Sequence, residues 1–204
     1  MRAPRLVSCL AACVIAALLA VVAPPGTAAP DPEYDATIRI TEHGIPHVTA
    51  DDWGSLGYGS GYATAASSIC NLADTLLTAR GQRSKYLGAE ARYLDGVSMD
   101  ASNLQVDAFV TDLHNRKVVE SLLDSPAGPS KRAQEMVEGY AAGINRWLRD
   151  NEVTDPACKD AAWITPDATT LDLWYGVYLA NLLASSGVFL KEIVDATPPA
   201  LTDP

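Results

Sequence analysis

The sequence lacks the short motifs that identify common catalytic sites of hydrolytic enzymes. It contains no Gly-x-Ser-x-Gly element, which would hold a nucleophilic serine on a sharp turn, and no His-Glu-x-x-His element, which would bind zinc on a helix. Histidine is scarce, with His43, His47 and His114 as the only three. Serine and aspartate are abundant, but no spacing among them points to a catalytic triad. The residues alone therefore assign no catalytic site.

Two partial patterns are better explained by structure than by chemistry. His43 and His47 have a spacing that binds zinc on a helix, but Gly44 and Pro46 prevent a helix there, so a turn or a surface role is favoured. The glycines of the segment 57–61 resemble a phosphate-binding loop. No Lys-Ser/Thr pair follows them, and they lie inside or beside a helical stretch, so close helix packing is the better interpretation.

Basic residues are outnumbered, and the formal net charge is −10. Arg2 and Arg5 are the only charged residues among the first 29, so the rest of the chain carries −12. A surface this acidic repels phosphate backbones, which disfavours nucleic-acid binding. With 48% hydrophobic and 20% charged residues, the composition is that of a globular domain with a sizeable core.

The N-terminus has the three parts of a secretory signal peptide. Arg2 and Arg5 precede an uncharged run over residues 6–23, and Pro24-Pro25-Gly26 ends that run. Small residues follow, so we expect cleavage near Ala29 and a secreted or periplasmic mature protein. The alternative is a membrane anchor, because about 18 apolar residues approach the spanning length. The cleavage site and the prolines favour the signal peptide, and we expect no stable membrane anchor.

The mature chain retains few cysteines. Cys9 and Cys13 leave with the signal peptide, and Cys70 and Cys158 remain. An even pair in an oxidising compartment predicts a disulfide. Two cysteines with no histidine nearby make a poor metal site.

The chain is expected to be mostly α-helical, with one short β-hairpin near its N-terminus and no internal repeat. Alternation and turn residues predict strands over 36–41 and 47–50, joined by a turn at 43–46. Short turns are expected at Gly88 and Gly96, and residues 196–199 end the ordered part. The expected helices begin near Trp53 after a cap at Asp51 or Asp52, continue over 65–79 after the small residues 57–63, and then cover 104–123, 130–151, and 170 or 172 to about 194. The last helix is apolar on more than one side, which is typical of a segment that completes its core against another chain.

The amphipathic helix over residues 136–148 carries two glycines. Each interior glycine costs on the order of 1 kcal/mol relative to alanine. Gly139 and Gly143 lie four apart and share one face. We predict that this face lies against another backbone, within this chain or across an interface with a second chain.

Several segments, in order along nearly the whole mature chain, resemble the α chain of the penicillin acylase (penicillin amidase) family. The nearer resemblance is to the branch with aculeacin A acylase and the acyl-homoserine lactone acylases. The segments that carry it are 42–59, from Glu42-His43-Gly44-Ile45-Pro46-His47 to Gly57-Tyr58-Gly59, then Gly61-Tyr62-Ala63, Gly81-Gln82-Arg83-Ser84, Gly139-Tyr140-Ala141-Ala142-Gly143-Ile144-Asn145, Asp155-Pro156-Ala157-Cys158, Asp172-Leu173-Trp174 and Ala196-Thr197-Pro198-Pro199.

The resemblance implies an architecture and an activity. Family members are made as a precursor of signal, α chain, spacer and β chain, and self-cleavage frees a serine at the β-chain N-terminus. That serine is the nucleophile and its α-amino group is the base. The implied fold is the αββα sandwich of N-terminal-nucleophile hydrolases, with this chain supplying helices around the sheets of a β-chain partner. Residues 30–196 would be the α chain and residues 197–204 the start of the spacer or a disordered tail.

The implied role of this chain is to help build the pocket for the acyl group of a lipopeptide, an acyl-homoserine lactone or a penicillin. It holds no catalytic residue, and the isolated chain is expected to be inactive. The acyl pocket is predicted along the last helix, where core packing is the alternative for any single residue. The substrate-binding candidates are Leu182, Ser185, Ser186, Val188 and Phe189.

No cofactor or metal ligand is assigned. Some relatives bind calcium through an α-chain carboxylate, but no matching residue stands out. The sequence departs from the family pattern at Ala65-Ala66-Ser67, where relatives usually carry acidic or amide residues. The alternative interpretation of the whole chain is a non-catalytic secreted helical binding protein, or an orphan α chain without its partner.

Overall fold

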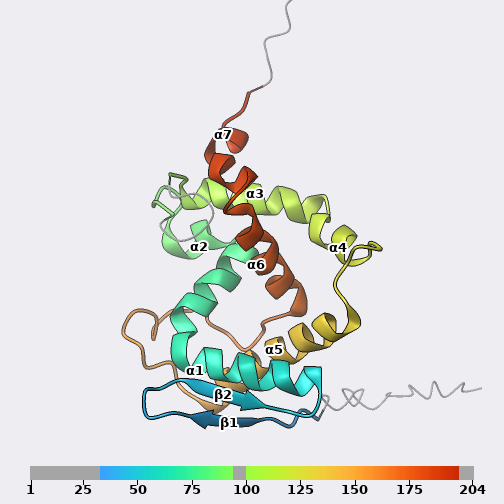
Figure 1. Ribbon diagram of the computed structural model, residues 1–204. Coiled ribbons are helices and arrows are strands. Elements are labelled where there is room, and N and C mark those ends of the chain that lie inside the picture. The colour runs from blue at the N-terminus through green and yellow to red at the C-terminus, as the bar shows by residue number, and fades with distance from the viewer. Residues whose placement is uncertain (1–32, 94–99, 198–204) are drawn as a thin grey trace, which may run out of the picture. The chain divides into compact units, whose positions relative to one another are not determined.

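The computed structural model describes residues 33–93 and 100–197 (Figure 1). The predicted signal peptide, the turn at Gly96 and the end of ordered structure at Pro198 and Pro199 lie outside the described residues. The described part is mostly helical with a two-stranded hairpin at its N-terminal end, which confirms the predicted class. No single described helix is long and apolar enough to cross a membrane, and one pair bent by 84°, Thr170–Leu182 with Ser186–Val194, meets that test on length and composition alone.

The predicted hairpin is confirmed. Strands β1 (Thr37–Ile40) and β2 (Pro46–Thr49) pair antiparallel, with Ile38 opposite Val48. The turn is closed by hydrogen bonds between Thr41 and Ile45, and Gly44 adopts a φ of 80° that favours glycine. Such a hairpin needs a surface to pack on, and in Figure 1 it runs along the first helix.

Helix α1 (Trp53–Ala79) is one long helix with a kink, where we had expected a helix, a small-residue stretch and a second helix. Asp52 caps it by accepting the backbone N–H of Ser55 at 2.7 Å, as predicted. The small residues lie inside the helix because close neighbours compensate for their poor helix propensity. The kink falls at Ser68 (φ −152°, ψ 40°). Just before it, the Ser67 hydroxyl donates to the Ala63 carbonyl, a local bond that bends helices.

Helix α5 (Lys131–Asp150), capped by Ser130, packs along α1 through glycines on both helices. A Cβ on Gly57 or Gly61 would lie 1.9 or 2.1 Å from the carbonyl oxygen of Met136 or Tyr140, respectively. A Cβ on Gly139 would lie 1.9 Å from the Gly54 carbonyl oxygen. Backbone therefore meets backbone in both directions. This contact confirms the prediction for the α5 glycines and shows that their partner lies within this chain.

The predicted helix 104–123 is two helices, α3 (Asn103–Asn115) and α4 (Val118–Leu123). They are separated at Lys117, which adopts the left-handed conformation with φ 50°. A lysine gives no sign of such a break, since the left-handed region usually attracts glycine or asparagine. Before α3 lies the short helix α2 (Arg83–Leu87), which was not predicted, and the expected turn follows it at Gly88, where φ is 87°.

The predicted last helix is also interrupted. It consists of α6 (Thr170–Leu182), the 3₁₀ helix η1 (Ser186–Phe189) and α7 (Leu190–Val194). The break follows from Ser185-Ser186-Gly187, residues of low helix propensity. Thr169 caps α6 in a capping box with Asp172, so the helix begins at Thr170, one of its two predicted starts. The largest core cluster joins α3, α4, α6 and α7 around Val110, Tyr175 and Leu190, all fully buried.

Candidate functional site

The predicted substrate-binding residues lie at the corner formed by the end of α6, η1 and the start of α7. Leu182 is half-buried against the core cluster, whereas Ser185 and Ser186 are exposed. Val188 and Phe189 are 51% and 60% exposed, unusually high for large apolar side chains. At this corner the side chains of Ser185, Ser186, Val188 and Phe189 are therefore exposed to solvent, whereas Leu182 packs partly against the core.

The corner has buried anchors on either side of its exposed residues. Gly187 and Leu190 are buried and hold η1 and α7 to the core. The Asp195 carboxylate accepts hydrogen bonds from Gln105 of α3 at 2.7 Å and from Lys191 at 2.8 Å. The two buried residues hold the backbone beneath Val188 and Phe189 to the core, so the exposure of these side chains does not arise from a loose tail.

Helix α6 is held to α3 and α4 by Tyr175. Its hydroxyl donates to the Glu120 carboxylate at 2.8 Å, and its ring stacks on His114 with ring centroids 3.7 Å apart. Burial and the hydrogen bond to Glu120 raise the pKa of the Tyr175 phenol above its usual range. The His114 Nε2 lies 2.8 Å from the Ala79 carbonyl oxygen. These contacts give His114 a packing role, while His43 and His47 lie on the exposed hairpin.

The start of α6 is tied to the end of α1 by an ion pair. The Arg80 guanidinium donates to Asp172 at 2.8 Å and to Asp167 at 3.0 Å. Burial alone would raise the pKa of Asp172, but hydrogen bonds from Arg80 and Thr169 outweigh it and lower that pKa. The hydrogen bond to Asp172 in turn raises the pKa of Arg80. Asp172, part of the Asp172-Leu173-Trp174 segment, is therefore a structural charge in this chain.

The Gly81-Gln82-Arg83-Ser84 segment forms a buried polar cross-link rather than a site for chemistry. Arg83 is 5% exposed and donates to Asn103 at 2.9 Å and to Asp74 at 2.6 Å. The Asp107 carboxylate accepts the backbone N–H groups of Arg83 and Ser84 and also the Ser84 hydroxyl. A buried guanidinium is stable only when its donors are satisfied, so this network fixes α2 between α1 and α3. The residue pattern did not predict this role, and the one available signal was an arginine within a segment that resembles the family.

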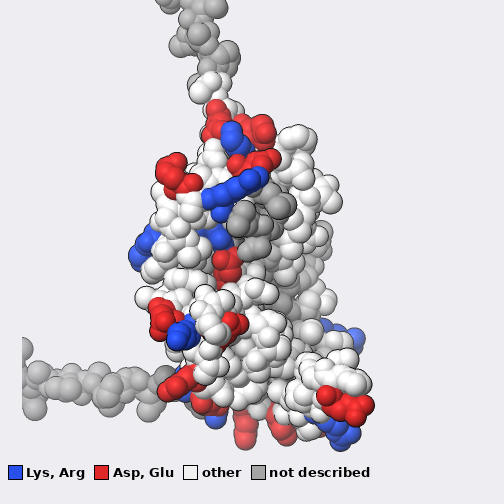
Figure 2. All heavy atoms as spheres, turned by 90° about the vertical axis from the view of Figure 1, so that its left-hand side faces the viewer, with Lys and Arg blue, Asp and Glu red and all other residues white. Residues whose placement is uncertain are grey.

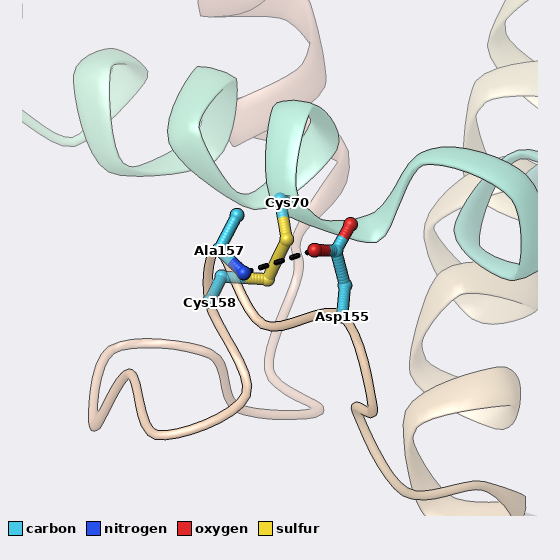
Figure 3. Close-up of a disulfide and its surroundings, with 4 residues drawn as sticks. All are labelled: Cys70, Asp155, Ala157 and Cys158. Atoms are coloured by element: carbon cyan, nitrogen blue, oxygen red, sulfur yellow. Dashed lines mark hydrogen bonds between the residues drawn. A yellow bond between two sulfur atoms is a disulfide. The ribbon is translucent and has the colours of Figure 1, made fainter.

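The predicted disulfide between Cys70 and Cys158 is present, and it ties α1 to the loop after α5 (Figure 3). The loop turns tightly at this point, where the Asp155 carboxylate accepts the Ala157 backbone N–H at 2.9 Å. Ala65, in the segment that departs from the family pattern, is fully buried in the cluster around Trp147 and Cys158. The small residue there lets the helix pack directly on this cluster.

Metal ligands are not gathered anywhere in residues 33–93 and 100–197, where no group of three or more His, Cys, Asp or Glu side chains could hold an ion. The charged side chains on the face in Figure 2 are of both signs and interspersed, with wide areas that carry neither.

Large apolar side chains remain exposed at several further places. In addition to Val188 and Phe189, the set contains Ile40, Ile45, Trp53, Leu104, Leu122, Val177, Leu183 and Ile193, each more than 40% exposed. Single exposed apolar residues are ordinary. Four members of the set, however, fall between Leu183 and Ile193, and such a concentration is typical of an interaction surface.

These features define a helical segment with a rigid scaffold, an apolar corner and no nucleophile–base pair assigned within its described residues. Residues 35–190 match the Penicillin amidase family, and the chain belongs to that family. Among similar proteins, Aculeacin-A acylase of Actinoplanes utahensis is 37% identical over 194 residues, covering 94% of this chain and 24% of the relative. The acyl-homoserine lactone acylase PvdQ of Pseudomonas putida is 38% identical over 197 residues, with the same two coverages.

A solved structure supports the fold. The thermostable penicillin G acylase from Alcaligenes faecalis aligns with a TM-score of 0.52 at 20% identity, over 77% of this chain and 75% of that chain. The present chain spans about a quarter of the length of the two curated relatives. These matches confirm the family resemblance and the fold class.

Proposed function

We propose that this chain is the α-chain part of an exported amidohydrolase whose nucleophile is the N-terminal serine of a β chain from the same precursor. The observation that carries the proposal is the family match over residues 35–190 in a chain about a quarter as long as its relatives. Residues 1–29 would be a cleaved signal peptide, residues 30–196 the α chain, and residues 197–204 the start of the spacer or a disordered tail.

The proposed reaction is acyl transfer to water through an acyl-enzyme. The serine hydroxyl attacks the amide carbonyl, and the α-amino group of the same serine accepts its proton. That proton passes to the departing amine as the C–N bond breaks, and water then hydrolyses the ester. An α-amino group has a pKa of about 8, so it is a competent base near neutral pH. None of these groups belongs to this chain, which is why its own motifs assign no catalytic site.

The proposed contribution of this chain is part of the acyl-binding surface. Val188, Phe189 and the exposed part of the half-buried Leu182 would contact the acyl chain, while Ser185 and Ser186 would lie near its polar end. Burial of an acyl chain contributes about 0.8 kcal/mol per methylene, or about fourfold in binding. The proposed substrate is an N-acyl compound such as a lipopeptide or an acyl-homoserine lactone, and the similarity to proteins named Aculeacin-A acylase and acyl-homoserine lactone acylase supports this class. A penicillin is the third candidate.

The test is to express the complete coding region and assay the product against N-acyl amides of increasing acyl length. We expect two chains by mass spectrometry, an N-terminal serine on the larger, and kcat/KM that rises with acyl length until the pocket is full. Absence of amide hydrolysis by a folded, processed product would overturn the proposed activity and favour a non-catalytic binding protein. A flat length profile would exclude the hydrophobic pocket.

A further inference from the structure

Among the glycines of α1, α5 and α6, one has no close contact with the residues that the structure describes. Seven glycines lie in α1, α5 and α6, and for six of them an added Cβ would meet another atom at 3.0 Å or less. The exception is Gly176 of α6, where a Cβ would meet only the Thr75 Cγ2 atom, at 3.4 Å. That distance is an ordinary contact. Alanine would fit there and would favour the helix, so no contact among the described residues accounts for the glycine at this position.

Gly176 lines an open groove between α1, α5 and α6. The groove has a volume of about 420 Å³ and an almost wholly apolar lining. Leu72 and Tyr140 contribute to its walls from α1 and α5, and Leu173 and Val177 flank Gly176 on α6. Val177 is 49% exposed. The one carboxylate of the lining, Asp172, is already paired with Arg80, so the groove offers no free charge to a polar ligand.

The composition of α6 explains why the groove should be covered. The helix is apolar on more than one side, which is typical of a helix covered on more than one face. Tyr175 and Leu179 bury one side in the core cluster, while Gly176 and Val177 line the open groove on another. Within the residues that the structure describes, nothing packs over Val177 closely enough to bury it.

We propose that this groove receives apolar side chains from the part of the same precursor that lies outside residues 1–204, and that Gly176 allows them to approach the α6 backbone. The inference rests on the proposed function for the existence of that second part. Two observations select the occupant: the relatives are about four times as long as this chain, and the lining is apolar with no unpaired charge. The groove is separate from the corner at Val188 and Phe189, so it is an assembly surface rather than a substrate site.

The first test places the photo-cross-linker p-benzoylphenylalanine at Val177 in the complete gene product, with the same residue at Leu122 of α4 as a control. Leu122 is equally exposed, at 50%, and lies outside the groove. We expect cross-linked peptides from beyond residue 204 at position 177. Cross-links only to residues 1–204, of the same or a second copy, or no cross-link at position 177, would overturn the proposal.

The second test compares Gly176→Ala with Gly176→Leu in the same gene product. The alanine variant should assemble within about twofold of the parent, because its methyl group has room. The leucine side chain should fill the groove and reduce the yield of assembled protein at least about tenfold. Equal loss in both variants would assign the constraint to packing against Thr75, and no loss in either would mean that the groove stays empty; both outcomes overturn the inference.

Amidase activity of the unsubstituted product separates this inference from the proposed function. If the protein is active but gives no cross-link at position 177, the groove inference is overturned and the proposed function stands. If the protein is inactive but cross-links to residues beyond 204, the proposed function is overturned and the groove inference stands.

Discussion

Gly143 of α5 lies directly against Tyr58 of α1, such that a Cβ on Gly143 would fall 2.0 Å from the Tyr58 carbonyl oxygen. The two helices thus meet through their backbones, and an added methyl group cannot be accommodated by a side-chain rotation. An exposed helical glycine would gain about 1 kcal/mol from replacement by alanine. At Gly143 the steric clash with the Tyr58 carbonyl oxygen outweighs this gain in helix propensity.

We therefore expect Gly143→Ala to destabilise the protein by about 3 kcal/mol, because α1 and α5 must separate. Gly143→Leu should give little processed product, since the scaffold beneath the proposed site would not form. Thermal unfolding and the yield of processed chains measure the two effects. Gly176→Ala is the matched control, because its methyl group meets only the Thr75 Cγ2 atom at 3.4 Å. An unchanged melting temperature for Gly143→Ala would contradict the backbone contact.

Removal of the disulfide should lower stability without altering the chemistry. The bond between Cys70 and Cys158 closes a loop of 88 residues. In the chain-entropy model this loop is worth about 4–5 kcal/mol, and measured values are often lower. The double variant Cys70→Ala/Cys158→Ala should melt earlier than the parent, and reductant should lower the parent to a similar value. Reductant should not shift the double variant further; a shift there would point to another redox-sensitive group.

The ion pair between Arg80 and Asp172 predicts a pH dependence of stability. The pKa of Asp172 is lowered in the folded chain, so the carboxylate contributes stability above its unfolded pKa of about 4, and this contribution is lost as the pH falls through the lower folded pKa. Asp172→Asn should cost about 2 kcal/mol at pH 7 and progressively less below about pH 4. Melting temperatures from neutral to acidic pH measure this change.

Asp195→Asn is the control for that experiment, because this carboxylate is exposed and its pair with Lys191 lies on the surface. Its effect at pH 7 should be small. An Asp172→Asn variant whose deficit does not diminish in acid would show that the amide disrupts packing rather than removing a charge.

Phe189 tests the proposed acyl surface with little risk to folding, since its side chain is 60% exposed. If an acyl chain covers the ring, Phe189→Ala should reduce kcat/KM about tenfold for long acyl chains and much less for short ones. Leu122→Ala, on an equally apolar exposed site of α4, should leave the length profile unchanged. An equal loss at every acyl length would assign Phe189 to subunit contact or folding instead of acyl recognition.

The local elements of the fold could be predicted because neighbouring residues determine them. Asp52 and Ser130 cap helices as expected from their side-chain oxygens, and the turn around Gly44 follows from its freedom at positive φ. The disulfide followed from a count of two cysteines in a chain expected to be exported. The spacing of Gly139 and Gly143 indicated a close backbone contact without identifying its partner.

The break between α3 and α4 could not be predicted in the same way, whereas the break after α6 had a local signal in Ser185-Ser186-Gly187. Lys117 adopts a left-handed conformation although it has no intrinsic preference for it, because α3 and α4 both pack on the same core cluster. At residues 57–63 the close helix packing expected for the glycines is confirmed, but the segment lies inside α1 instead of separating two helices, because α5 and the hairpin occupy the space that side chains would fill. Tertiary contacts outweigh propensity differences of about 1 kcal/mol per residue.

By itself, the sequence determined the mostly helical class, the hairpin, the caps, the cysteine pair and the family, since these depend on residue types at fixed spacings. Only the tertiary structure decided that α1 is the partner of the α5 glycines, that Arg83 and Asp172 are structural charges, and that Val188 and Phe189 remain in solvent while Leu182 packs inward. It also showed that Gly176, unlike the glycines of α1 and α5, has no close contact among the described residues. The physical reason is that burial and backbone contact arise between residues far apart in the chain, and no local pattern records which surfaces meet.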